Sequence, residues 1–156
     1  MVKQIKSSEV KAFLAENSGA VLLDVRTENE WTTLGKPELK DLNSKTYFIT
    51  ISPDLTKWQE PDPDFVKTVK KVINKETQVL VMCSAGGRSM IAANLLEKEG
   101  FTVHNISDGY SGSDKGPGWK KAILPTNYWF RSFIFDCALI LLFKSAILFL
   151  NKAQTS

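Results

Sequence analysis

The stretch that decides the fold lies in the middle of the chain and reads Val79-Leu80-Val81-Met82-Cys83-Ser84-Ala85-Gly86-Gly87-Arg88-Ser89. Its first four residues form an apolar run that is too short for a helix and is typical of a buried strand. From Ser89 onward, apolar residues recur at helical spacing until Gly100, which stands where a C-terminal cap belongs. The stretch therefore predicts a strand, a loop of small residues and a helix, one directly after the other.

The residues on either side repeat this alternation of strands and helices. Compact apolar runs at 21–25 and 47–51, and a weaker run at 102–106, predict three further strands. Ser8 caps a predicted helix that ends near residue 16, and Pro63 opens another. Strands that alternate with helices predict crossover connections and a parallel sheet, and nearly continuous apolar strands predict helices on both of its faces. The fold class is therefore α/β.

The composition excludes several classes of protein. The chain has 156 residues, with 43% hydrophobic and 24% charged residues, so it is neither fully disordered nor fibrous. Its 20 basic and 17 acidic residues leave a net charge of +3, which argues against a nucleic-acid partner. Two cysteines cannot build a disulfide framework, and a reducing compartment is the simpler interpretation. No Cys/His cluster has the spacing of metal ligands, so neither a metal nor another cofactor is expected.

The chain divides near Pro125 into a body and an apolar tail. We expect a domain at residues 1–126 and a hydrophobic C-terminal tail at 127–156. Residues 128–150 are long enough to cross a bilayer as a helix, and their apolar side chains about balance the insertion cost of Asp136 and Lys144. The prediction leans towards a membrane helix. Two alternatives stay open for the tail. It could be a helix that packs on the body or on a second copy of the chain, or it could be an accident of the reading frame. Basic residues precede the segment, so the positive-inside rule predicts a cytoplasmic body anchored by the tail.

The loop after the central predicted strand carries the candidate chemistry. Open α/β sheets bind ligands at the carboxyl ends of their strands, where Cys83 stands. Glycines let the backbone curl into a nest of N–H groups, and the helix that follows points its positive end at the same place. This setting favours the thiolate, which is the nucleophilic form of cysteine. Arg88 adds a cation whose fork of donors suits sulfate-like or phosphate-like oxygens.

The sequence therefore predicts a nucleophilic sulfur inside an anion cradle. Cys83 is the candidate catalytic residue, and the candidate substrate-binding residues are the rest of the loop: Ser84, Ala85, Gly86, Gly87, Arg88 and Ser89. A buried, inert cysteine is the alternative, but a cysteine followed by two glycines, an arginine and a helix start favours the catalytic interpretation. Cys137 has no such loop and is interpreted as structural. His104, the only histidine, is predicted to be a half-exposed strand residue and not a base.

Several motifs together resemble a single-domain rhodanese. They are Asp24-Val25-Arg26, Glu30-Trp31, the loop from Cys83 to Ser89, Asp108-Gly109-Tyr110 and Gly118-Trp119. The resemblance covers nearly all of the body and implies a five-stranded parallel sheet between helices. It also implies a thiosulfate sulfurtransferase-type enzyme. In that reaction Cys83 takes the outer sulfur of thiosulfate or a related small anionic donor, becomes a persulfide, and passes the sulfur to cyanide or a thiol.

The resemblance also implies roles for two residues near the loop: Asp24 would help to hold it, and Arg26 would pair with nearby carboxylates. A purely structural role for both, as polar groups that stabilise the fold, stays open. Glu30 is expected to pair with a basic neighbour in a structural role. Ser84 stands where the family often has a basic residue, which leaves Arg88 as the only evident cation of the loop.

Other side chains could act near the loop or at a distance from it. Trp58 and Tyr110 could line the mouth of the pocket. Lys67, Lys70 and Lys71 form either a solvated helix face or a basic patch, which would steer an anionic donor or dock an acidic sulfur-carrier protein.

Two other classes of function stay open. Cysteine-dependent phosphatases and arsenate reductases share this type of fold, but the phosphatases use a Cys-x5-Arg loop. Cys83 and Arg88 are separated by four residues, which makes a tighter cradle that suits a persulfide sulfur better than a phosphoryl group. A non-catalytic binding module on the same scaffold is the second alternative, and the retention of Cys83 together with the rest of the loop argues against it.

Overall fold

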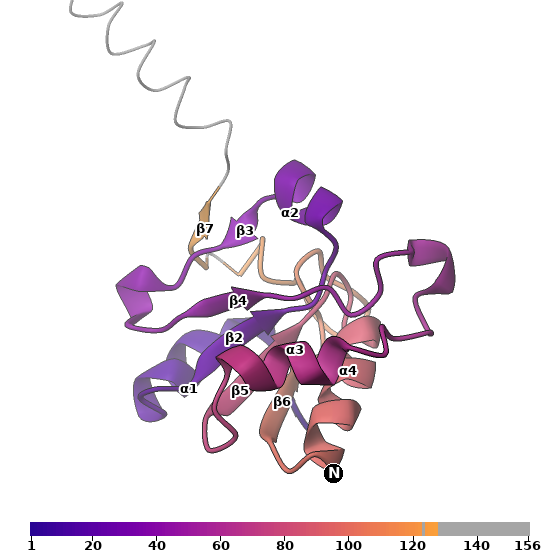
Figure 1. Ribbon diagram of the computed structural model, residues 1–156. Coiled ribbons are helices and arrows are strands. Elements are labelled where there is room, and N and C mark those ends of the chain that lie inside the picture. The colour runs from indigo at the N-terminus through magenta and orange to yellow at the C-terminus, as the bar shows by residue number, and fades with distance from the viewer. Residues whose placement is uncertain (123, 128–156) are drawn as a thin grey trace, which may run out of the picture.

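The computed structural model describes residues 1–122 and 124–127, which form a parallel five-stranded sheet with helices on both faces (Figure 1). The strands lie in the order β1 (Lys3–Ile5), β6 (Thr102–Ile106), β5 (Gln78–Met82), β2 (Val21–Asp24) and β4 (Thr46–Phe48). Every neighbouring pair is parallel, and Leu80 of β5 stands opposite Leu22 of β2 and His104 of β6. The predicted α/β class and the five-stranded parallel sheet are confirmed.

Helices cover both faces of this sheet. α3 (Phe65–Val72) and α4 (Gly87–Lys98) contribute to a buried apolar cluster on one face. α1 (Val10–Glu16) contributes to a second cluster on the opposite face. Both faces of the strands are therefore apolar, as expected for a parallel sheet between helical layers.

β5 lies at the centre of the sheet because both of its faces are apolar. Val79, Leu80, Val81 and Met82 have no exposed surface. The two valines pack in the cluster of α3 and α4, whereas Leu80 and Met82 pack in the cluster of α1. Burying each such side chain contributes about 1.5–3 kcal/mol. The strand therefore connects both layers firmly and fixes the position of Cys83, which follows it.

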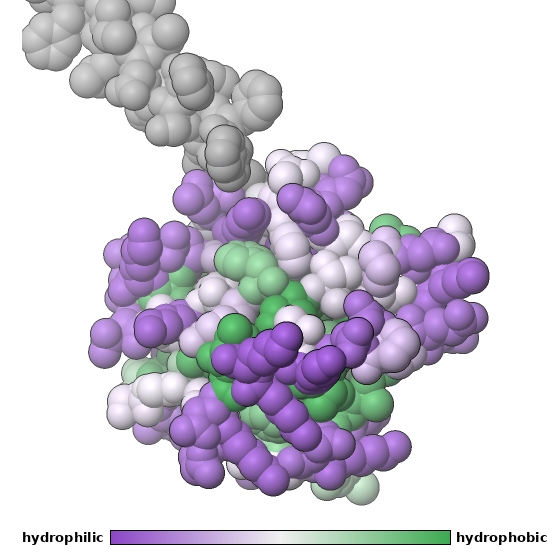
Figure 2. All heavy atoms as spheres, viewed as in Figure 1, coloured by the Kyte–Doolittle hydropathy of each residue, from purple (hydrophilic) through white to green (hydrophobic). Residues whose placement is uncertain are grey.

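The outer face of α3 is polar, as its sequence pattern predicts. Lys67, Lys70 and Lys71 are exposed, whereas Phe65 and Val69 of the same helix are buried. In Figure 2 hydrophilic residues, in purple, lie across the region that α3 occupies in Figure 1, with hydrophobic residues, in green, beside them. The helix is thus amphipathic, and its lysines face solvent.

Smaller elements complete the described part of the chain: α2 (Glu28–Leu34), the 3₁₀ turns η1 (Ser7–Glu9), η2 (Lys40–Leu42) and η3 (Leu55–Lys57), and the antiparallel pair of β3 (Lys36–Pro37) and β7 (Thr126–Asn127). The sequence patterns did not predict α2 or the edge strand β1. α2 begins at a capping box, in which Thr27 and Glu30 each bond the other's backbone N–H. The Thr-x-x-Glu pattern is the signal that could have predicted this helix.

The strand predicted at 47–51 is shorter than expected, since β4 ends at Phe48. The backbone N–H groups of Ile49 and Ile51 still donate to the carbonyls of Asp24 and Val25, at 3.1 and 3.3 Å. The chain therefore stays beside β2 after the regular ladder has ended.

The helix predicted at residues 128–150 lies outside the described residues, as does Cys137 within it. In residues 1–122 and 124–127, no helix is long and apolar enough to cross a membrane. The tail at 127–156 and its attachment to a membrane therefore stay predictions.

Candidate functional site

Cys83 follows the buried strand β5 directly and lies at the carboxyl edge of the sheet. Its Sγ atom accepts hydrogen bonds from the backbone N–H of Gly86, at 3.2 Å, and from the Ser89 hydroxyl, at 3.3 Å. Donors aimed at a sulfur stabilise negative charge on it, because hydrogen bonds to an ionised acceptor are stronger than neutral ones. The predicted curl of the loop around Cys83 is present, and Gly86 and Ser89 are the residues that contact the sulfur.

The curled loop packs directly on the backbone that follows β6. Gly86 has a φ of +93°, and a Cβ atom there would lie 2.1 Å from the carbonyl oxygen of Ser107. Gly109 has a φ of +63°, and its Cβ would lie 2.5 Å from the carbonyl oxygen of Ser84. The N–H of Tyr110 donates to the Cys83 carbonyl at 2.8 Å. These positions require glycine, since only a residue without a side chain lets the two backbones approach so closely.

Asp108 holds this second loop in place. Its buried carboxylate accepts hydrogen bonds from the N–H of Ser7, at 2.8 Å, from the Ser7 hydroxyl, at 2.6 Å, and from the N–H of Gly118, at 3.0 Å. Asp108 belongs to one of the motifs quoted above, but no role was expected for it. The Asp-Gly pair that follows the predicted strand after one residue is a turn signal that could have indicated this anchor.

Arg88 is engaged by a carboxylate. Its two terminal nitrogens donate to the two carboxylate oxygens of Glu30, at 2.8 and 2.7 Å, and both side chains are nearly buried. The expected pairing of Glu30 with a basic neighbour is confirmed. The fork of Arg88, which the sequence predicts to bind an anionic ligand, donates to Glu30 through both of its terminal nitrogens.

Burial opposes charge on both members of this pair, and their mutual contacts outweigh it. Hydrogen bonds to Glu30 and its negative charge raise the pKa of Arg88 above its ordinary value, with smaller contributions from Cys83 and Asp24. Hydrogen bonds from Arg88 and Thr27 lower the pKa of Glu30. The pair is therefore ionised at neutral pH.

Asp24 and Arg26 form a second ion pair that is fully buried. Arg26 bonds the Asp24 carboxylate through Nε, at 3.0 Å, and through Nη2, at 2.7 Å, and it also donates to the Gly35 carbonyl. Its guanidinium carbon lies 3.7 Å from the ring centroid of Tyr110. The expected pairing of Arg26 is confirmed, and the pair reaches the Cys83 loop through Tyr110.

The two candidates for the pocket mouth differ in position. Trp58 is 40% exposed, and its ring lies 3.5 Å from the place of a Cβ on Gly87, so it stands beside the loop. Tyr110 has no exposed surface and lies beneath the loop, against Arg26. Trp58 is therefore the aromatic side chain that a ligand at this loop could meet.

His104 is buried, with 6% of its surface exposed, so the prediction of a half-exposed residue is wrong. Its ring packs edge-on against Phe13 of α1, with centroids 4.7 Å apart. Burial and, to a smaller extent, the charge of Lys3 lower the pKa of His104. The helix α1 covers this part of β6, which the strand pattern alone did not indicate.

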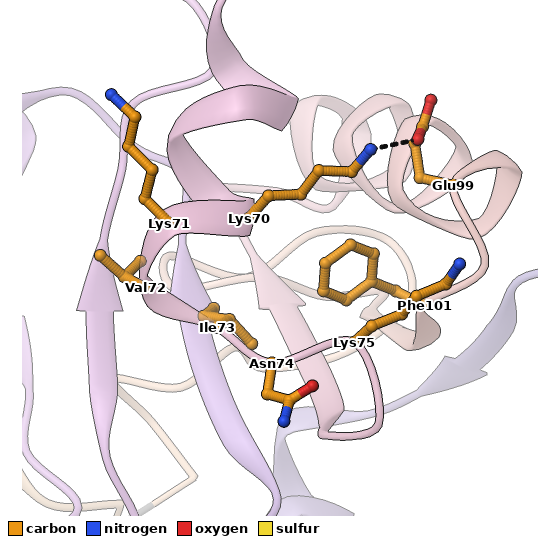
Figure 3. A pocket seen from close by; sticks show the side chains of 8 residues that line it. All are labelled: Lys70, Lys71, Val72, Ile73, Asn74, Lys75, Glu99 and Phe101. Carbon is orange, nitrogen blue, oxygen red and sulfur yellow. Dashed lines mark hydrogen bonds and ion pairs between the residues drawn. The ribbon is translucent and has the colours of Figure 1, made fainter.

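The lysines of the possible basic patch on α3 lie far from Cys83. Lys70, Lys71 and Lys75 line a cavity of about 580 Å³ between the end of α3, the turn before β5 and the turn before β6 (Figure 3). Figure 3 shows Lys70 extended towards Glu99, with which it forms an ion pair. The cavity is at the amino end of β5 and Cys83 is at the carboxyl end, about 16 Å away along the strand. These lysines therefore contribute no cation to the Cys83 loop.

Comparisons with known proteins identify the family and the fold. The family model of the rhodanese-like domain matches residues 7–115. An uncharacterized protein of Rickettsia prowazekii (strain Madrid E) is 34% identical over 131 residues, which cover 82% of this chain and 99% of that protein. Thiosulfate sulfurtransferase 18 of Arabidopsis thaliana is 31% identical over 110 residues, which cover 70% of this chain and 76% of that protein. The crystal structure of Rv0390 from M. tuberculosis superimposes with a TM-score of 0.69 at 26% identity, over 81% of this chain and 97% of that one.

Proposed function

The chain belongs to the rhodanese-like domain family, and from this premise we propose that it is a sulfurtransferase that carries sulfane sulfur as a persulfide on Cys83. The observation that carries the proposal is the pair of donors at the Cys83 sulfur, the N–H of Gly86 and the hydroxyl of Ser89. Both stand ready to stabilise a thiolate before attack, and after transfer they can hold the inner sulfur of the persulfide. The name of the Arabidopsis relative, thiosulfate sulfurtransferase, is consistent with the proposal.

The reaction has two steps, with thiosulfate or a related sulfane compound as donor. In the first, the Cys83 thiolate bonds to the outer sulfur of the donor, the sulfur–sulfur bond of the donor breaks, and sulfite or a thiolate leaves with the electron pair. In the second, an acceptor thiolate or cyanide bonds to the outer sulfur of the persulfide, and Cys83 leaves as a thiolate. The chain needs only one nucleophile for this cycle, since each step regenerates a sulfur anion.

The Arg88 pairing favours sulfur transfer over the phosphatase and arsenate reductase alternatives. Phosphoryl transfer demands cations on the equatorial oxygens of the transferred group. Both terminal nitrogens of Arg88 donate to Glu30, so the carboxylate already offsets the positive charge that such oxygens would need. A persulfide sulfur, which is small and carries at most one charge, makes no such demand.

Steady-state turnover tests the proposal. The full chain, supplied with a sulfane donor and cyanide, is expected to form thiocyanate, and Cys83→Ser is expected to abolish this. Cys137→Ser is the matched control, because it removes the other thiol of the chain and should leave turnover intact. Wild-type rates in Cys83→Ser would contradict the proposal.

A further inference from the structure

The charges around Cys83 indicate which sulfur donors the loop can accept. We propose that Glu30 is a specificity-determining residue: by neutralising Arg88 it makes the site select uncharged or singly charged persulfides of organic thiols over the thiosulfate dianion. The inference rests on the proposed function and names the donor class for the same site.

The Arg88–Glu30 pair leaves little of the guanidinium for a ligand. Both terminal nitrogens are bonded to Glu30 in a two-pronged arrangement, which is the strongest geometry that an arginine and a carboxylate can form. The exposed fractions of the two side chains are only 9% and 11%. Glu30 is itself fixed by Thr27, whose N–H and hydroxyl both donate to it. A ligand that meets Arg88 therefore meets a guanidinium whose charge the Glu30 carboxylate already offsets.

The remaining groups at this edge of the sheet do not supply a replacement cation. Arg26, the second buried arginine of the described residues, is matched by Asp24. The loop residues between Cys83 and Arg88 are Ser84, Ala85 and two glycines, none of which is charged. The two arginines and their two carboxylates therefore sum to zero, and the loop offers only dipoles to an anion.

The two donor classes place different charges in this neutral cradle. Thiosulfate brings two negative charges to the Cys83 thiolate, so the attacking complex carries three, and sulfite leaves with two. A neutral persulfide R–S–SH brings none, and its anion brings one. With the neutral form, the thiolate bonds to its outer sulfur, the S–S bond breaks, R–S⁻ leaves with the electron pair, and the proton stays on the transferred sulfur. Repulsion between like charges at contact distance is strong away from bulk water, so the electrostatic part of the barrier is lower for the persulfide.

Trp58 supplies an independent reason to favour an organic donor. Its ring stands beside Gly87, and it is one of the large apolar side chains that the described chain leaves exposed. An exposed aromatic next to the loop can contact the organic part of a persulfide. Thiosulfate has no such part.

The test compares two donors, thiosulfate and the freshly prepared persulfide of 2-mercaptoethanol, with the full chain and its variants. Glu30→Gln has one acceptor oxygen in place of two, which frees at least one nitrogen of Arg88, and glutamine still completes the capping box with Thr27. We expect kcat/KM for thiosulfate to rise about tenfold or more relative to kcat/KM for the persulfide. Glu28→Gln is the matched control, since it removes the same charge from an exposed position of the same helix and should leave the ratio unchanged.

A second variant keeps the proposal testable if Glu30→Gln does not fold. Ser84→Lys adds a cation to the loop without touching the Arg88–Glu30 pair, and it is expected to shift the same ratio towards thiosulfate. A wild-type ratio in a folded Glu30→Gln, or an equal shift in Glu28→Gln, overturns the proposal. Ser84→Lys with an unchanged ratio does so as well. If neither donor places sulfur on Cys83 of the wild type, the proposed function itself fails, which is a different result.

Discussion

Ser89 is a side chain of the loop that contacts the Cys83 sulfur. Its hydroxyl donates to Sγ, and a hydrogen bond to a charged group contributes about 1.5–3 kcal/mol. We expect Ser89→Ala to lower kcat/KM for sulfur transfer about tenfold or more, since about 1.4 kcal/mol corresponds to a factor of ten. Alkylation of Cys83 by iodoacetamide should slow in parallel, because it depends on the same thiolate.

Ser111→Ala is the matched control for this variant. The Ser111 hydroxyl lies 3.0 Å from the hydroxyl of Ser84, on the same loop, and the contact is exposed. Its loss should leave both alkylation and turnover close to wild type. Equal effects of the two substitutions would mean that the Ser89 contact with the sulfur has no special role.

The residues of the Cys83 loop could be predicted from the sequence, but the state of Arg88 could not. Cys83, Gly86 and Ser89 are close neighbours in the chain, so a strand, a glycine loop and a helix start already bring them together. The partner of Arg88 is 58 residues away on α2. Only the folded chain shows that this carboxylate accepts hydrogen bonds from both terminal nitrogens of the guanidinium.

At the level of elements, the junction of β5, the loop and α4 depends on close backbone packing. Gly86→Ala is expected to lower the free energy of unfolding by about 1–3 kcal/mol more than Gly19→Ala, because its Cβ would meet Ser107. Gly19 is the matched control: its φ of +88° is close to the +93° of Gly86, but nothing lies within 4 Å of its Cβ position. Both variants therefore carry the same backbone strain, and urea unfolding reports the difference. Equal losses would contradict the close approach.

The start of α2 should make stability depend on pH. Glu30 has a folded pKa below its ordinary value of 4.5, so its pairing stabilises the protein above that pH and is lost as the pH falls through the lower folded value. We expect the free energy of unfolding of wild type to exceed that of Glu30→Gln at pH 6–7, and the difference to shrink as the pH falls below about 4.5. Urea unfolding of both proteins over this range measures it. A difference that is constant with pH would show that the carboxylate charge contributes nothing.

The strands with a strong apolar pattern were predicted, whereas α2 and β1 were not. β5 is apolar on both faces, so the apolar run from Val79 to Met82 is sufficient to predict this strand. α2 owes its start to the side chains of Thr27 and Glu30, and β1 is a short edge strand in which Lys3 and Gln4 are exposed. The local pattern of Thr27 and Glu30 could have predicted α2, whereas β1 depends on its pairing with the distant strand β6, which a window of sequence does not contain.

At the level of the whole molecule, we expect the sheet and its helices to fold without the C-terminal tail. Strand β7 extends to Asn127, so a truncation after residue 127 keeps every described element. We expect residues 1–127 to be soluble and to retain sulfur transfer, since they contain the five strands of the sheet and the described residues of both apolar clusters. The full chain is expected to sediment with membranes and to resist extraction by high salt, because salt screens charges and barely weakens apolar insertion.

Fractionation followed by detergent extraction separates the outcomes. Release of the full chain by detergent alone supports an inserted helix. Recovery of the full chain in the soluble fraction contradicts membrane attachment, and a dimer that becomes monomeric on truncation would assign the tail to self-association. If residues 1–127 do not fold, the tail belongs to the body, and the expected division of the chain is wrong.

The formation of a persulfide on Cys83 can be measured directly as the mass of the protein after a single exposure to a sulfane donor. The full chain, treated with excess donor and freed of it, is expected to gain one sulfur atom on the peptide that contains Cys83, and to lose it on addition of a thiol. Because Cys83 is the nucleophile proposed here, Cys83→Ser should gain none, and Cys137→Ser should gain one. A wild-type protein that takes up no sulfur from thiosulfate or from the persulfide, or a sulfur found on another residue, would contradict the assignment of Cys83 as the sulfur carrier.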